Sequence, residues 1–156
     1  NYVTLSATAK VINFFFFAKN IAKAIKKALS FQIRSANKDL LKMEKVQPKH
    51  SILQYDIGLT FAQMGDMKQA YKHFIRSYHL DAKNYLAGVY AVMSAKLINK
   101  DVTTLKSIIK DALSNEKDSE EKELCKTLLY IVDNNYLGAI EWLDNSFKQR
   151  PLYLAM

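Results

Sequence analysis

The near absence of helix-breaking residues is the feature that most constrains how this chain can fold. Its 156 residues include only four glycines and two prolines. A sandwich or barrel of short strands needs frequent turn residues, and a doubly wound α/β fold usually needs more glycine in its loops. Because 49% of the residues are hydrophobic, the chain can still bury a core and is not a disordered segment. An all-α fold is therefore predicted.

Apolar residues recur at helical spacing, and short polar turns divide the chain into segments. Asp66 follows Gly65 and is a plausible N-cap, because its carboxylate can accept the free amide hydrogens of the next first turn. Asp118 and Glu121 resemble a capping box. Because the connections are short, helices that follow each other in sequence should be antiparallel neighbours. The predicted helices are residues 4–29, 51–64, 66–80, 84–98, 102–113, 120–132 and 136–149.

The predicted helices pair up with a repeat of about 34 residues. Three copies match most of a set of small, aromatic and proline positions, and a fourth, from about Leu86 to Asn115, is degenerate. The residues are Gly58, Phe61, Ala70, Phe74, Ser77 and Ala82 in one copy, Thr127, Tyr130, Ala139, Leu143, Ser146 and Pro151 in another, Ala24, Ala36, Leu40, Met43 and Pro48 in a third, and Leu105, Ile109 and Ala112 in the degenerate copy.

This pattern resembles the tetratricopeptide repeat (TPR) family. The resemblance implies a TPR-like right-handed superhelix of stacked antiparallel helix pairs. Small residues would let two helices approach closely, with Gly58 and Ala70 at the tight crossing, and the copies must stack because one pair cannot bury its apolar face. Four positions depart from the family pattern: Gln54 and Lys27 replace large apolar or aromatic residues, Leu105 replaces alanine and Ala82 replaces proline.

The repeat divides the chain into one solenoid segment over residues 1–156. The expected repeats are residues 17–50, 51–84, 85–118 and 120–153, with residues 1–16 as a helix of a preceding repeat or a cap. The chain begins without methionine and ends in a stretch that resembles a first helical turn, so we expect a fragment of a longer protein.

The TPR resemblance implies binding of a peptide, a helix or a second solenoid in a concave groove. The first helix of each pair would line this groove, which is largely apolar, and two tyrosines occur in it. The candidate residues are Tyr55, Leu59, Gln63, Tyr90, Ser94 and Leu97. Some family members clamp the terminal carboxylate of a partner with lysine and asparagine residues in the groove. In this sequence Tyr55 and Leu59 occupy the first pair of those positions, so we do not expect such a clamp. The same side chains could instead be buried by the next superhelical turn.

The basic charge of the chain suggests an alternative site. Residues 1–50 hold ten lysines and arginines against two acids, while the rest of the chain is balanced, so the net charge of +8 is local. A basic face could meet nucleic acid, an anionic membrane or an acidic protein, or could simply be solvated. We expect nucleic acid and membrane to be minor possibilities, because arginine is scarce. The candidate residues of this basic face are Lys19, Lys23, Lys26, Lys27 and Arg34.

Residues suited to catalysis or metal binding are scattered. His73 and His79 are six apart and face different sides of one helix, so we expect surface or partly packed residues. Cys125 is expected to be a free thiol in or near the core. No paired cysteine motif or glycine-rich phosphate loop occurs in the sequence. We therefore expect no enzyme activity, no metal and no cofactor.

Richness in Lys, Asn, Ile, Phe and Tyr is typical of AT-rich bacterial genomes. The expectation is a scaffold module of a larger bacterial assembly protein, in envelope machinery such as a flagellar motor, a secretion system or a pilus. Its compartment would be the cytoplasm or the periplasm.

Overall fold

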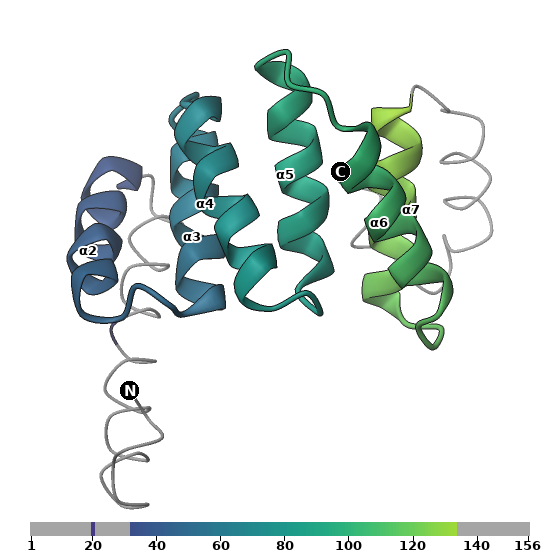
Figure 1. Ribbon diagram of the computed structural model, residues 1–156. Coiled ribbons are helices and arrows are strands. Elements are labelled where there is room, and N and C mark those ends of the chain that lie inside the picture. Colours follow the sequence, from purple (N-terminus) through teal and green to yellow (C-terminus); the bar gives the residue numbers. More distant parts are fainter. Residues whose placement is uncertain (1–19, 21–31, 134–156) are drawn as a thin grey trace, which may run out of the picture.

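The computed structural model describes Asn20 and residues 32–133, and this part is all-helical. Its helices are α2 (Ile33–Val46), α3 (Ser51–Gln63), α4 (Met67–Leu80), α5 (Tyr85–Leu97), α6 (Thr103–Ser114) and α7 (Glu120–Val132). Consecutive helices run in opposite directions (Figure 1). The predicted all-α fold of stacked antiparallel helix pairs is confirmed. The predicted helices at residues 4–29 and 136–149 lie outside the described residues, apart from Asn20, which is helical.

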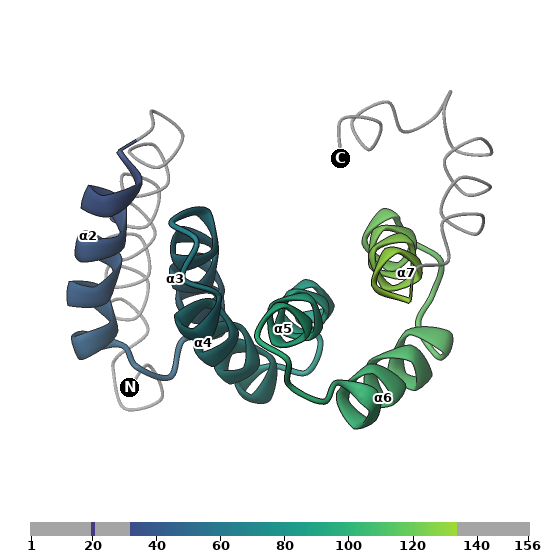
Figure 2. The same ribbon diagram turned by 90° about the horizontal axis from the view of Figure 1, so that it is seen from above.

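The helices follow a curve when seen from above (Figure 2). Helices α3, α5 and α7 lie on the inner side of this curve, and α4 and α6 lie on the outer side. Helix α4 packs extensively on both α3 and α5, while α6 packs less extensively on α5. Leu105 stands in α6 where the repeat pattern has a small residue, which gives a steric reason for the looser third pair.

The turns predicted from the sequence end the helices as expected. Gly65 after α3 and Asn99 after α5 both have left-handed backbone, with φ of 81° and 59°. In each turn a later amide donates to the carbonyl five residues before it, from Asp66 to Phe61 (2.9 Å) and from Lys100 to Ala95 (2.8 Å). This bond satisfies carbonyls that the helix leaves free, and it needs a left-handed residue, which glycine and asparagine tolerate best.

Side-chain caps start α3, α4, α5 and α7, whereas α2 and α6 begin without one. Asp66 Oδ1 accepts from the Gln69 amide at 3.1 Å and confirms the predicted cap of α4. The predicted capping box of Asp118 and Glu121 is wrong: Ser119 Oγ accepts from the Lys122 amide, and Asp118 pairs with the Lys122 ammonium. Serine caps a helix as well as aspartate does, and here the adjacent Ser119 takes that position.

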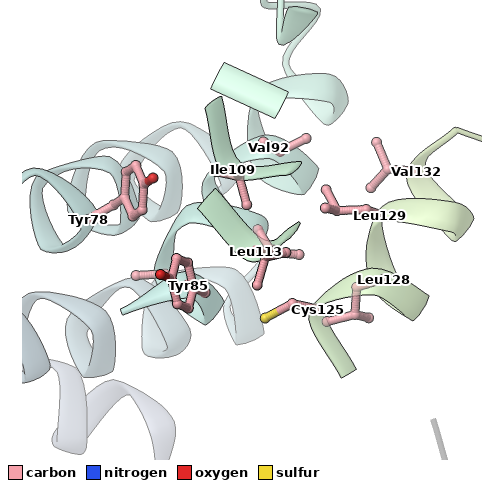
Figure 3. Close-up of a cluster of buried hydrophobic side chains, with 11 residues drawn as sticks. Tyr78, Tyr85, Val92, Ile109, Leu113, Cys125, Leu128, Leu129 and Val132 are labelled. Atoms are coloured by element: carbon pink, nitrogen blue, oxygen red, sulfur yellow. The ribbon is translucent and has the colours of Figure 1, made fainter. Parts of the chain in front are cut away.

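The core shows why the first full pair is tight. A Cβ added to Gly58 would lie 2.6 Å from two carbons of the Phe74 ring, so α3 and α4 can meet at this distance only with glycine. Ala70 is fully buried beside Phe74. A second cluster joins α4 to α7, where Tyr78, Ile109, Leu113 and Cys125 lie among the side chains drawn in Figure 3.

A buried polar cluster crosses α2, α3 and α4. The side-chain amide nitrogen of Gln54 donates to Glu44 Oε1 at 3.0 Å and to the Pro48 carbonyl. The amide oxygen of Gln54 lies 2.8 Å from His73 Nδ1. Because this oxygen can only accept a hydrogen bond, Nδ1 of His73 carries the hydrogen. Burial lowers the pKa of His73, and Glu44 opposes the shift. His73 is therefore a buried residue, which corrects the predicted surface or partly packed position: the polar Gln54 gives its ring a partner inside the core.

Candidate functional site

Three aromatic rings from successive helices form the centre of the candidate groove. Tyr55 of α3 and Tyr90 of α5 have ring centroids 6.0 Å apart. Both rings contact Phe74 of α4, at 5.9 Å for Tyr55 and 5.6 Å for Tyr90. Phe74 is buried, whereas each tyrosine is half-buried. The core thus holds the two tyrosine rings in place and leaves part of each at the surface.

The tyrosine hydroxyls have no hydrogen-bond partner among the side chains and backbone groups of the described residues. Burial raises the pKa of Tyr55, and the neighbouring Tyr90, Asp56, Cys125 and Glu121 add to the shift. Burial likewise raises the pKa of Tyr90. Both phenols stay protonated at neutral pH and can donate to a partner.

Cys125 places α7 beside this site, because it belongs to the buried cluster against which Tyr55 and Tyr90 pack. Glu121 is exposed, and Leu124 is half-buried against the larger core cluster. Together with Figure 2, this indicates that α3, α5 and α7 contribute to one surface on the inner side of the curve.

The other predicted groove residues differ in accessibility. Leu59 is half-buried, Gln63 is exposed, and Leu97 is 67% exposed at the end of α5. Ser94 is only 4% exposed, which corrects its predicted place on the groove surface. Helix α5 is packed by α4, α6 and α7, and this packing encloses Ser94. We call the remaining set, Tyr55, Leu59, Gln63, Tyr90 and Leu97, the tyrosine face.

One carboxyl group lies in the core without a partner. Asp56 is 9% exposed, and its Oδ2 accepts no hydrogen bond. Burial raises the pKa of Asp56 to about 6, because removal from water disfavours the charged carboxylate. The sequence did not predict this burial, because aspartate is ordinarily exposed.

The predicted basic face falls mainly outside the described residues. Lys19, Lys23, Lys26 and Lys27 are not among them, and Arg34 is exposed on α2. Arg34 and Gln63 both line a pocket of about 550 Å³ between the start of α2 and the end of α3. Four exposed basic residues recur along α2 with helical spacing and form the set we call the α2 stripe: Arg34, Lys38, Lys42 and Lys45.

A further pocket, which the sequence did not predict, lies between the start of α4 and the turn after α5. It has a volume of about 640 Å³, and we call it the lysine pocket. Its lining residues are Lys68, Gln69, Tyr71, Lys72, Ile75, Ile98 and Lys100. The two segments that form it, residues 68–75 and 98–100, lie far apart in the sequence, so no local motif could have revealed it.

The described residues show no grouping of three or more His, Cys, Asp or Glu side chains that could hold a metal ion. Burial raises the pKa of the Cys125 thiol to about 12, which keeps it protonated and unreactive. In the same part of the chain, no helix combines the length and apolar character needed to cross a bilayer.

Comparison with known proteins shows the fold. The structure resembles the type III secretion translocator chaperone SycD of Yersinia enterocolitica, with a TM-score of 0.64 and 12% sequence identity over 86% of this chain and 90% of that one. It also resembles a structure of Naa15/Naa10 bound to HypK-THB, with a TM-score of 0.56 and 22% identity over 87% of this chain but only 20% of that one. No family model and no curated protein matches the sequence. The chain has a TPR-like helical repeat fold.

Proposed function

We propose that this chain is a non-enzymatic protein-binding scaffold that holds an amphipathic helix or an extended peptide on the tyrosine face. The observation that carries the proposal is the pair of half-buried tyrosines, Tyr55 and Tyr90, fixed by Phe74 with 6.0 Å between their ring centroids. Fold alone does not give function, so the proposal depends on this surface and not on the TPR-like architecture.

The chemistry of the tyrosine face suits a protein partner. Fixed tyrosines offer apolar area and a polar tip while losing little side-chain entropy, and they are among the residues that dominate binding energy at interfaces. Leu59 and Leu97 extend the apolar area, and Gln63 gives it a polar edge. This arrangement matches the apolar stripe and polar flanks of an amphipathic helix, whereas a small ligand would need a deeper enclosure.

We further propose that the partner belongs to an assembly process of a bacterial cell envelope. The composition supports a bacterial source, and a translocator chaperone of a type III secretion system is among the proteins of similar fold. A second solenoid remains an alternative partner, because a curved helical surface can also pack against helices of another chain.

Site-specific photo-crosslinking tests the tyrosine face. A benzoylphenylalanine at Gln63 or at Leu97 should crosslink to one and the same protein in extracts of the source organism, because both positions are exposed at its edges. The same group at Lys117, exposed in the turn before α7, is the matched control and should give no such adduct. Equal adducts at all three positions, or none at any, would contradict the proposal.

Two substitutions then assign the contact to the tyrosines. Tyr55→Ala/Tyr90→Ala should weaken binding of the captured partner at least about tenfold, as expected for hot-spot residues. Tyr55→Phe/Tyr90→Phe keeps the ring packing and removes only the hydroxyls, so it separates loss of binding from loss of folding. Unchanged affinity in both variants would refute the role of these residues.

The alternative function is binding of nucleic acid or another anionic surface through the basic face. The exposed α2 stripe supports it. Reversal of Lys23 and Lys27 to glutamate should abolish such binding, and rising salt should weaken it steeply. Binding through the tyrosine face should resist both changes.

A further inference from the structure

The lysine pocket carries positive charge that no described acidic side chain neutralises. Of its three ammonium groups, those of Lys68 and Lys72 have no carboxylate partner among the described residues, and that of Lys100 lies over the Tyr71 ring at 5.0 Å from its centroid. None of the lining residues is acidic. The nearest carboxylates in sequence, Asp66 and Asp101, accept hydrogen bonds from the backbone amides of Gln69 and Thr103.

A pocket between α6 and α7 shows the opposite arrangement of charge. Two lysines line this pocket. There Lys110 pairs with Asp133 at 2.6 Å and Lys126 pairs with Glu123 at 3.4 Å. Positive charge at that pocket is neutralised within the chain, whereas at the lysine pocket it is left for another molecule.

The floor of the lysine pocket is apolar. Tyr71, Ile75 and Ile98 are half-buried and line it beneath the exposed lysines. An anion alone, such as free phosphate, would leave this apolar area in water. A ligand that also carries a large apolar side chain would cover it, which adds a contribution proportional to the area buried.

We infer that the lysine pocket is a second interaction site, which binds an acidic segment of another protein with carboxylates on both sides of a large apolar side chain. The lysines would meet the carboxylates, and Tyr71 with the two isoleucines would receive the apolar side chain. This site uses residues outside the tyrosine face, so the two sites can be tested separately and one can fail without the other.

A fluorescence anisotropy titration of the full chain tests the inference. The probe is a fluorescein-labelled peptide of about twelve residues, with a central Leu-Phe pair flanked by Asp and Glu. At about 50 mM salt, where surface charges are weakly screened, it should bind saturably to the unchanged protein. Lys68→Glu/Lys72→Glu/Lys100→Glu should weaken binding at least about tenfold, because three attractions become repulsions. Lys49→Glu/Lys83→Glu/Lys117→Glu, at exposed positions outside both the lysine pocket and the α2 stripe, is matched in charge and should weaken binding at most about twofold.

Two further ligands separate the acidic segment from other anions. A peptide with serine in place of Leu-Phe should bind at least about fivefold more weakly, because it leaves the apolar floor uncovered. A single-stranded oligonucleotide of equal charge should not displace the labelled peptide. The inference is overturned by no saturable binding, by equal losses in the two triple variants, by equal affinity of the serine peptide, or by displacement with the oligonucleotide. Because all six lysines are exposed, circular dichroism should show unchanged helix content in both variants.

Discussion

Gly58→Ala measures how closely α3 and α4 approach. The new Cβ would lie 2.6 Å from Cδ1 and Cε1 of Phe74 and 3.0 Å from Cγ, about 1 Å closer than carbon atoms normally pack. Phe74 is 1% exposed and lies against Tyr55 and Tyr90, so its ring has no free space to enter. Helix α3 or α4 must shift instead.

Two opposing effects set the size of the change. Overpacking of this kind costs about 1–3 kcal/mol, whereas alanine is about 1 kcal/mol better than glycine inside a helix. The expected net loss in the free energy of unfolding is therefore about 0–2 kcal/mol, measured by urea denaturation followed by circular dichroism. Gly88→Ala is the comparison, because its added Cβ would meet the flexible end of Ile109 at 2.9 Å and the Tyr78 ring only at 3.0 and 3.1 Å. It should cost less than Gly58→Ala.

A double-mutant cycle isolates the clash itself. Phe74→Leu removes part of the ring that the new methyl group would meet, so Gly58→Ala should cost less in that background, with a coupling of at least about 0.5 kcal/mol. If Gly58→Ala were as stable as the unchanged protein and did not couple to position 74, the inferred close approach of α3 and α4 would be wrong.

Three further predictions concern buried polar groups. The pKa of Asp56 is raised to about 6, so its ionisation lowers the free energy of unfolding above that pH, and this loss disappears as the pH falls towards about 4. Asp56→Asn should therefore raise the free energy of unfolding at pH 7.5 by about 1–3 kcal/mol. An unchanged pH profile of unfolding would contradict this prediction. Gln54→Ala removes the partners of Glu44 and His73 and should cost at least about 1–3 kcal/mol in urea; a loss within error would show that the cluster does not stabilise the fold. Cys125 is fully buried with a pKa raised to about 12, so a thiol reagent at pH 8 should label it only as fast as the protein opens, and rapid labelling of the folded protein would disprove its enclosure.

Much of the fold could be predicted from local sequence because helix ends depend on nearby residues. Gly65 and Asp66 were correctly interpreted as the turn and cap between α3 and α4. The predicted start of α7 was wrong, because Asp118 and Ser119 are both chemically capable caps and the path of the backbone selects Ser119. The candidate groove was only partly predictable: helical spacing put Tyr90 and Ser94 on one face, yet neighbouring helices enclose Ser94 and leave Tyr90 half-buried.

The sequence by itself determined the all-helical class, the turns and the pairing of adjacent helices, because helix propensity, capping and short connections act over a few residues. The tertiary structure alone decided which polar groups are enclosed, as with His73, and which distant residues meet, as with Lys72 and Lys100 at one pocket. The physical reason is that burial and electrostatic environment depend on every helix around a side chain, and the angles and distances between helices are not contained in the periodicity of any one of them.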